Sequence, residues 1–308
     1  MKAQVILNPN AGQRDRRHEL QAAMAYLEDH GWQLTLRETQ GPGEATTYAR
    51  QAAAEGYDVV IAAGGDGTVS EVANGLAGSE AALGIFPIGT TNVWALQMGI
   101  PPLWPLRQHS LLEAAKVLAE GHIRRVDLGQ VNGRYFLLWA GVGLDAKITE
   151  EVEPEAKKRL GALAFVIASI LVAKEFAGTK VQMTIDGCEV NRRAILIVAS
   201  NAQLYAGIVR LAAQARLDDG LLDVLIFKGQ GFPAMLRHLF SVLTSRHLRD
   251  PQVEYYQARR VKISSTKPLS VHADDEPFTI TPVEIGVVPQ ALRVVVPQAL
   301  PPGLFTAS

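Results

Sequence analysis

A glycine-rich turn that carries one carboxylate is the strongest chemical signal in this sequence. Residues 64–68 read Gly-Gly-Asp-Gly-Thr and follow the apolar run 59–63. Helical periodicity begins at Val69, so the pattern predicts a buried strand, a tight turn and a helix N-terminus. Backbone N–H groups in such a turn can bind phosphate, and the helix dipole favours the negative charge. Asp66 adds a carboxylate suited to a metal ion or a substrate hydroxyl. We therefore expect this turn to bind a nucleotide phosphate.

Two further polar turns are expected at strand ends. Residues 8–12 read Asn-Pro-Asn-Ala-Gly, and residues 87–92 read Pro-Ile-Gly-Thr-Thr-Asn. Asn, Pro and Gly also favour ordinary turns, and Thr90 or Thr91 could simply cap a helix. The carboxyl ends of parallel strands line one crevice, which favours the interpretation that both turns belong to the same site.

Two acidic turns lie in the second half of the chain. Residues 218–223 read Asp-Asp-Gly-Leu-Leu-Asp, and residues 272–277 read His-Ala-Asp-Asp-Glu-Pro. Each pattern is also typical of an exposed turn. Hard cations such as Mg²⁺ prefer carboxylate and carbonyl oxygens, which the first turn could supply. One carboxylate of 274–276 could serve as a general base.

A third glycine pattern, Gly-Val-Gly-Leu-Asp-Ala at 141–146, matches a dinucleotide-binding motif. No acidic residue stands about 20 positions further on, where the ribose would need one. We therefore reject a Rossmann-type dinucleotide site. The P-loop pattern and zinc-ligand spacings do not occur in the sequence.

The first third of the chain alternates strand and helix signals, which predicts a doubly wound, mostly parallel sheet. We expect strands at 4–8, 32–36, 58–63 and 82–87, and helices near 20–27, 44–54, 69–76, 92–97 and 110–120.

After about residue 125 short alternating stretches predict an antiparallel β domain. We expect strands at 125–131, 134–140, 180–185, 194–200, 222–227, 257–264 and 269–273, helical insertions at 154–177 and 232–246, and a last strand at 291–297. Asn132-Gly133 and Asp186-Gly187 predict hairpins. The expected domains are an α/β nucleotide-binding domain at 1–125, a β domain at 126–290, and a segment at 291–308 whose domain stays open.

Composition excludes several classes of protein. The chain has 308 residues and a net charge of −1, so it has no overall positive charge that would attract nucleic acid. Cys188 is the single cysteine, which rules out an intrachain disulfide and fits a cytoplasmic protein. The apolar run 160–173 would span only ~21 Å as a helix, so we expect no transmembrane segment.

Taken together and in this order, the motifs resemble the diacylglycerol kinase catalytic family, in particular its soluble bacterial lipid kinases, which are similar to sphingosine and ceramide kinases. The likeness runs from Asn8 to Glu276 and covers nearly the whole chain. The family has an N-terminal α/β nucleotide-binding domain and a C-terminal β-sandwich, so the resemblance implies the fold class α/β plus β. It also implies ATP as phosphate donor and Mg²⁺ as cofactor.

The resemblance also implies roles for individual residues. Glu276 matches the catalytic base, and Asp66 is the second catalytic carboxylate. Asp219 matches a metal ligand, assisted by the backbone carbonyls of Arg216 and Leu221. The residues expected to bind the nucleotide are Asn8, Thr39, Gly64, Gly65, Asp66, Gly67, Thr68, Glu71 and Thr90.

Three departures from the family pattern bear on activity. Val93 stands where the family usually has Asp, Asp275 replaces a usual Gly, and 204–207 holds fewer glycines than usual. These departures raise the chance of an altered acceptor or of a catalytically weak protein. Two alternatives stay open: an NAD kinase, which shares a similar Gly-Gly-Asp-Gly-Thr motif, and a catalytically degenerate nucleotide-binding protein.

A lipid acceptor implies contact with a membrane surface. The acceptor could be diacylglycerol-like, phosphatidylglycerol-like or sphingoid, and the protein would act as a cytoplasmic enzyme peripheral to the inner membrane face. Lys157, Lys158 and Arg159 precede the apolar run 160–173, which suits an anionic interface. A core helix with a charged start explains the same pattern equally well. The sequence leaves a homodimer open.

Overall fold

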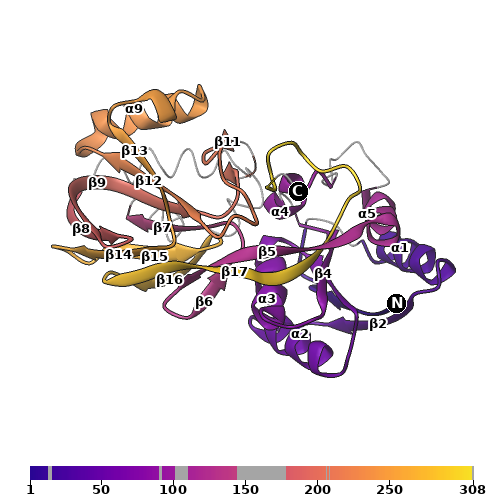
Figure 1. Ribbon diagram of the computed structural model, residues 1–308. Coiled ribbons are helices and arrows are strands. Elements are labelled where there is room, and N and C mark those ends of the chain that lie inside the picture. Colours follow the sequence, from indigo (N-terminus) through magenta and orange to yellow (C-terminus); the bar gives the residue numbers. More distant parts are fainter. Residues whose placement is uncertain are drawn as a thin grey trace. The chain divides into compact units, whose positions relative to one another are not determined.

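The computed structural model describes residues 1–12, 16–89, 92–100, 110–143, 178–205, 207 and 209–306 (Figure 1). The chain divides into two compact units. Unit 1 comprises Met1–Asp127 and Gln290–Leu304, and unit 2 comprises Leu128–Pro289 and Phe305–Ser308. The chain therefore leaves unit 1 after Asp127, returns to it at Gln290, and ends in unit 2.

Unit 1 is built on a parallel sheet in the strand order β2-β1-β3-β4. Its strands are β1 (Lys2–Leu7), β2 (Gln33–Glu38), β3 (Val59–Gly64) and β4 (Ala82–Pro87). Its helices are α1 (Arg17–Asp29), α2 (Glu44–Ala54), α3 (Asp66–Leu76), α4 (Val93–Gln97) and α5 (Ser110–Glu120). The end of β17 (Val283–Val296) adds a parallel strand beside β4, where Arg293 pairs with Ala82.

Helices cover both faces of this sheet, which is why its central strands read as continuous apolar runs. Every residue of β3 and β4 is buried. Helix α2 packs against α3, and α1 packs against α5 (Figure 1). Gly75 permits the close approach of α3 to α2, because a Cβ there would lie 2.5 Å from the Thr46 carbonyl oxygen.

Unit 2 is an antiparallel β structure whose strands run in the order β16-β15-β7-β9-β8-β14-β17, with β12 pairing both β9 and β13. Its strands begin with β5 (His122–Val131), which enters from unit 1, and continue with β6 (Arg134–Phe136), β7 (Trp139–Gly143), β8 (Thr179–Ile185), β9 (Cys188–Ser200), β10 (Leu204–Tyr205), β11 (Val209–Arg210), β12 (Leu222–Lys228), β13 (Val253–Ala258), β14 (Arg260–Ser265), β15 (Ser270–Ala273) and β16 (Glu276–Ile280). Helix α9 (Gly231–Leu243) and the 3₁₀ turn η1 (His247–Arg249) connect β12 to β13.

Alternating side chains of these strands form one apolar core, which includes Phe136, Ile197, Val224 and Ile285. The hairpins predicted at Asn132-Gly133 and Asp186-Gly187 are the β5–β6 and β8–β9 hairpins.

Two strands predicted as single are each divided in the structure. The stretch 134–140 forms β6 and β7, because residues 137 and 138 turn their N–H groups to the carboxylate of Asp274. The stretch 257–264 forms the end of β13 and most of β14. It breaks at Arg259, because Asp186 accepts the N–H groups of Arg259 and Arg260.

Other boundaries also differ from the expectations. Strand β16 was not predicted, and the strand expected at 291–297 is only the end of β17, a strand of 14 residues. The helix expected at 154–177 lies outside the described residues.

Candidate active site

The carboxyl ends of β1, β2 and β3 bring three predicted segments together in unit 1. Asn8 follows β1 and donates its N–H to the Ala63 carbonyl over 3.0 Å. Thr39 follows β2 and donates its N–H to the Leu7 carbonyl over 2.8 Å. The turn 64–68 follows β3 directly. These contacts place Asn8, Thr39 and the glycine turn at one edge of the sheet.

Asn8 connects the first turn to the glycine turn. Its side-chain Nδ2 donates to Thr68 Oγ1 over 3.2 Å, and its Oδ1 accepts the N–H of Asn10 over 3.0 Å. Both ends of the amide are thus used, so the side chain has a fixed orientation. Thr68 is buried at the first turn of α3.

The glycines of this edge are required by close backbone approach. A Cβ on Gly64 would lie 2.5 Å from the Thr68 Cβ, and a Cβ on Gly89 would lie 2.5 Å from the Gly65 Cα. The Gly64 carbonyl accepts the N–H groups of Ile88 and Gly89, each over 3.1 Å. The glycine turn and the start of the 87–92 turn therefore touch through backbone atoms.

Asp66 is the first residue of α3, and its carboxylate binds the N-terminus of α4. The N–H groups of Val93 and Trp94 donate to its two oxygens over 2.9 and 3.2 Å. Negative charge is stabilised at a helix N-terminus. Val93, at the position where the family usually has Asp, is only 2% exposed. The Asp66 carboxylate is therefore held in place by backbone donors rather than by a second side chain at position 93.

Glu71 has a similar structural use on the next turn of α3. Its oxygens accept the N–H groups of Gly43 and Ala45, over 3.0 and 3.1 Å, at the N-terminus of α2. Its carbonyl accepts the hydroxyl of Thr46 over 2.9 Å. Glu71 thus caps α2, which the sequence did not indicate. Thr90 lies outside the described residues.

Two arginines beside Asn8 were missed by the sequence analysis. Arg16 and Arg17 line a small cavity of about 30 Å³ together with Asn8 and Pro9. Arg16 pairs with Glu19 over 2.7 Å, and Arg17 lies 3.6 Å from Glu38. The signal that could have revealed them is the pair of basic residues soon after the 8–12 turn.

In unit 2 the three consecutive carboxylates 274–276 have three different environments. Asp274 is buried, and its oxygens accept the N–H groups of Leu137, Leu138 and Trp139. Asp274 and Asp275 both have left-handed backbone, with φ of 49° and 63°. This conformation suits the tight turn between β15 and β16, and it explains why the family usually has Gly at the second position.

Glu276 begins β16 and, like Asp275, is partly exposed. Its carboxylate forms an ion pair with Arg134 of β6. The Arg134 guanidinium also lies over the ring of Phe278, 5.2 Å from its centre. The pair fixes the direction of the Glu276 side chain at the start of an edge strand.

The acidic turn 218–223 has the donor set of a cation site. Asp219 accepts the Leu221 N–H over 3.0 Å. Asp223 is fully buried, and the Tyr255 hydroxyl donates to its Oδ1. Burial and the nearby charge of Asp219 raise the pKa of Asp223 to about 7.

Within the described ranges, the Oδ2 atom of Asp223 has no hydrogen-bond partner. An orphaned buried carboxylate oxygen beside a second carboxylate fits a hard cation. No group of three or more His, Cys, Asp or Glu residues arranged for a metal occurs among the described residues.

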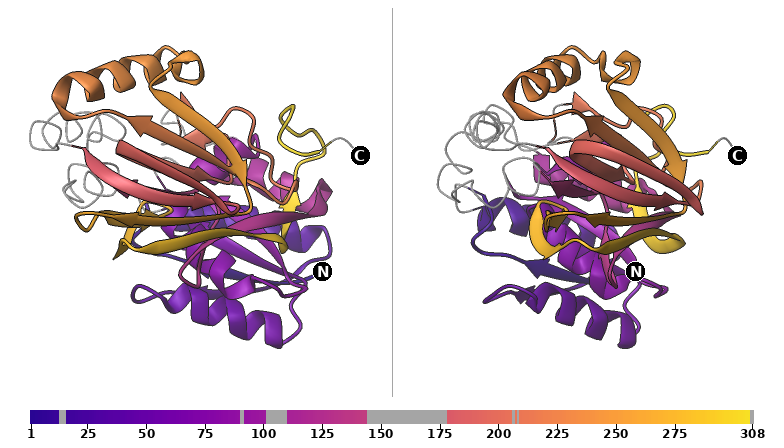
Figure 2. Two further views of the ribbon diagram at one scale, coloured as in Figure 1. Left: turned by 60° about the vertical axis from the view of Figure 1, so that its left-hand side comes forward. Right: turned by 90° about the vertical axis from the view of Figure 1, so that its left-hand side faces the viewer.

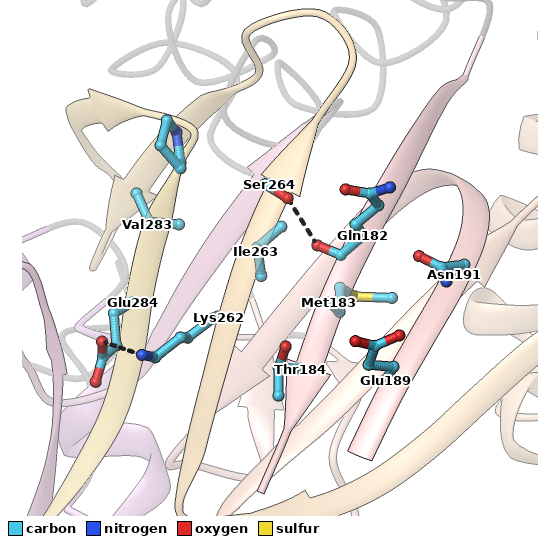
Figure 3. A pocket seen from close by; sticks show the side chains of 11 residues that line it. Gln182, Met183, Thr184, Glu189, Asn191, Lys262, Ile263, Ser264, Val283 and Glu284 are labelled. Atoms are coloured by element: carbon cyan, nitrogen blue, oxygen red, sulfur yellow. Dashed lines mark hydrogen bonds and ion pairs between the residues drawn. The ribbon is translucent and has the colours of Figure 1, made fainter. Parts of the chain in front are cut away.

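A larger depression lies elsewhere in unit 2, on the polar face of β8, β9, β14 and β17 (Figure 3). Its volume is about 440 Å³. Lys262 and Glu284 form an ion pair across it over 3.5 Å. It contains none of the residues that the sequence assigned to chemistry, so we do not place the reaction there.

Comparison with known proteins identifies the family. Residues 2–131 match the diacylglycerol kinase catalytic domain, and residues 139–296 match the YegS C-terminal NAD kinase beta sandwich-like domain. A diacylglycerol kinase of Bacillus subtilis (strain 168) is 31% identical over 299 residues, 96% of this chain and 97% of that protein. A diacylglycerol kinase of Staphylococcus aureus (strain bovine RF122 / ET3-1) is 32% identical over 278 residues, 89% of this chain and 86% of that protein.

Comparison with solved structures leads to the same family. The crystal structure of a diacylglycerol kinase from Bacillus anthracis str. Sterne has a TM-score of 0.75 at 26% identity and covers 97% of this chain and 98% of its own. These findings confirm the fold class, a mixed α/β N-terminal domain and a C-terminal β-sandwich. The chain is a kinase, a phosphotransferase with an alcohol group as acceptor. It belongs to the diacylglycerol kinase family, as the motifs had suggested.

No helix in the described ranges is both long enough and apolar enough to span a bilayer. The basic and apolar stretch 157–173, which the sequence offered as a membrane contact, lies outside those ranges.

Proposed function

We propose that this protein transfers the γ-phosphoryl group of ATP to the hydroxyl of a diacylglycerol-like lipid. The observation that carries the proposal is the glycine turn of unit 1. Close backbone packing holds it between the ends of β3 and β4, and partly buried hydrogen bonds orient Asn8 and Asp66 beside it. The names of the curated relatives favour a lipid acceptor over NAD. Phosphatidylglycerol-like and sphingoid acceptors remain the alternatives to diacylglycerol.

The nucleotide would be bound by the turns at the ends of the unit 1 strands. Backbone N–H groups at the start of α3 are suited to phosphate oxygens. Arg16 and Arg17 would add positive charge beside Asn8. Thr39, Glu71 and Thr90 complete the set that the family resemblance assigns to the nucleotide.

Phosphoryl transfer depends mainly on positioning and on neutralising charge, because the transition state needs little covalent work from the protein. Glu276 would accept the proton of the lipid hydroxyl. Arg134 would keep that carboxylate oriented. Asp66 would stand near the phosphates with its direction fixed by the α4 backbone.

Mg²⁺, when bound, would neutralise phosphate charge. Asp66 is the residue that would hold a catalytic ion, and Asp219 with the carbonyls of Arg216 and Leu221 would hold a second, structural one. Because Val93 supplies no carboxylate, the first site would hold its ion with fewer protein ligands than is usual in the family.

Labelled ATP and a total lipid extract provide the test. We expect the purified protein to label one lipid class, which mass spectrometry of the product would identify. Glu276→Gln should lower the rate about 10²–10⁴-fold, which is the usual contribution of a general base to the rate. Glu284→Gln, an exposed carboxylate in the same unit, is the matched control and should retain the wild-type rate.

Other outcomes would decide between the alternatives. Formation of NADP in a coupled assay, without lipid labelling, would identify an NAD kinase. ATP binding without turnover across a lipid panel would identify a degenerate nucleotide-binding protein. An unchanged rate in Glu276→Gln would remove Glu276 from the role of base.

We also propose that the protein is cytoplasmic and meets its acceptor as a peripheral protein at the inner membrane face. Homodimer formation remains a prediction that sedimentation of the purified protein would test.

A further inference from the structure

Helix α9 in unit 2 exposes large apolar side chains on the face opposite to its packed face. Leu236, Phe240 and Leu243 are 42%, 67% and 55% exposed. Their spacing of four and three residues places them in one row along the helix. Leu248, just beyond the helix, is also exposed. Single exposed apolar residues are common, but a continuous row of this kind marks an interaction surface.

The exposed row is not the face that anchors the helix. Met235, His238 and Ser241 are buried beneath it. The His238 ring contacts Phe227 edge-on at 5.2 Å, and its Nε2 lies 2.7 Å from the Lys228 carbonyl oxygen. Among the described residues, unit 2 therefore packs against one side of the helix, and the opposite side carries the exposed apolar row. In both views of Figure 2 the outer side of α9 faces no other described element of unit 2.

The same segment carries only positive charge. Residues 231–249 contain Arg237, Arg246 and Arg249 and neither Asp nor Glu. Arg237 is paired with Asp250 over 2.6 Å. Arg246 and Arg249 are exposed, and neither forms an ion pair with any described residue. Two cations that have no ion pair within the described part of the chain thus lie just beyond the C-terminal end of the row of apolar side chains.

We propose that this surface, formed by Leu236, Phe240, Leu243, Arg246 and Arg249, docks the protein on a bilayer that contains anionic lipids. The proposal rests on the proposed function, because a lipid acceptor resides in a bilayer. Phenylalanine and leucine side chains of a surface helix enter the headgroup boundary, and neighbouring arginines bind anionic lipid.

A second copy of the chain is the competing occupant of this surface. A twofold interface places the same patch on both partners. The arginines of one α9 would then face those of the other, with no acidic residue in 231–249 to balance them. An anionic bilayer supplies the opposite charge, and this is why we favour it.

Vesicle co-sedimentation tests the proposal. The probes are vesicles of phosphatidylcholine alone and vesicles of equimolar phosphatidylcholine and phosphatidylglycerol. We expect the wild type to bind the mixed vesicles, and the binding to weaken as salt is raised. The triple variant Leu236→Gln, Phe240→Gln, Leu243→Gln should lose binding at least tenfold. Arg246→Gln, Arg249→Gln should lose the salt dependence.

Leu36→Gln is the matched control, because Leu36 is a similarly exposed leucine in unit 1. This substitution should leave vesicle binding unchanged. A single variant, Phe240→Ser, repeats the test with a smaller change, and thermal unfolding confirms that each variant is folded. Equal vesicle binding by the folded triple variant and the wild type would overturn the proposal. So would a wild-type dimer that the triple variant converts to a monomer while vesicle binding persists.

Kinase assays separate this proposal from the proposed function. With acceptor embedded in mixed vesicles, the triple variant should be at least tenfold slower than the wild type. With a dispersed short-chain acceptor, the two should be equal. Vesicle binding needs no turnover, so a protein that binds through α9 but phosphorylates no lipid would contradict only the proposed function.

Discussion

Replacing Asp274 tests how the turn that carries Glu276 is held. The Asp274 carboxylate is 3% exposed and accepts backbone N–H groups of Leu137 and Leu138 over 2.8 Å and of Trp139 over 3.3 Å. Leu137 and Leu138 form the link between β6 and β7, and Trp139 is the first residue of β7. A single side chain therefore joins the β15–β16 turn to that link.

The magnitude follows from the three donors. In Asp274→Ala all three N–H groups lose their acceptor, at about 1–3 kcal/mol for each buried donor left unpaired, so we expect a loss of roughly 3–9 kcal/mol. In Asp274→Asn the remaining oxygen can still accept from Leu138, while the amide nitrogen faces the N–H of Leu137. We expect that variant to lose roughly 2–4 kcal/mol.

Urea unfolding followed by fluorescence and circular dichroism measures both losses. Asp275→Gly is the matched control in the same turn, because glycine adopts the left-handed backbone without strain, and it should gain about 0.5–1 kcal/mol. The reasoning is refuted if Asp274→Ala costs less than about 1 kcal/mol, or if the asparagine variant is the less stable of the two.

Four other changes have defined outcomes. Gly64→Ala should weaken ATP binding in calorimetry and lower stability by about 1–3 kcal/mol, because the new Cβ overlaps Thr68. Glu71→Gln should lower the free energy of unfolding by about 1–2 kcal/mol through loss of the α2 cap, and ATP affinity should fall only if Glu71 also contacts nucleotide. Burial lowers the pKa of His238, so the folded state holds it neutral and the unfolded state binds the extra proton. Stability should therefore fall as the pH drops below about 6.5, and melting temperatures from pH 7 to 5 should vary less in His238→Gln. Chelation of Mg²⁺ should lower the melting temperature of the wild type but not of Asp219→Asn.

Local patterns predicted the elements of unit 1 well. The helices expected at 44–54 and 110–120 are α2 and α5. In both segments the helical spacing of apolar residues starts and stops where the helix does, so the sequence shows both ends. The apolar runs of β3 and β4 were equally clear, since a parallel sheet buries both faces of its central strands.

Long-range contacts set the boundaries that the sequence could not predict. The division of 134–140 depends on Asp274, more than 130 positions away, and the division of 257–264 depends on Asp186. Nothing in either strand pattern shows that a distant carboxylate will take its N–H groups. The true length of β17 was missed because its middle residues are partly exposed.

The candidate site shows the same limit. The expected strand ends placed Asn8 and the glycine turn together, and the family resemblance added Thr39. Neither could show that Asp66 and Glu71 each bind the N-terminus of a helix. A carboxylate held by remote backbone donors and one that awaits a ligand have the same appearance in a sequence.

The discontinuous composition of unit 1 has a consequence for how the chain is made. When residue 127 leaves the ribosome, β4 has only β3 as a neighbour, because its other partner is formed by residues 293 and 294. That edge of β4 stays unpaired while the residues between 127 and 293, more than half of the chain, are synthesised. Open strand edges pair readily with other molecules. A shortened protein that ends near residue 127 would keep that edge open permanently, whereas one that retains 290–304 would close it.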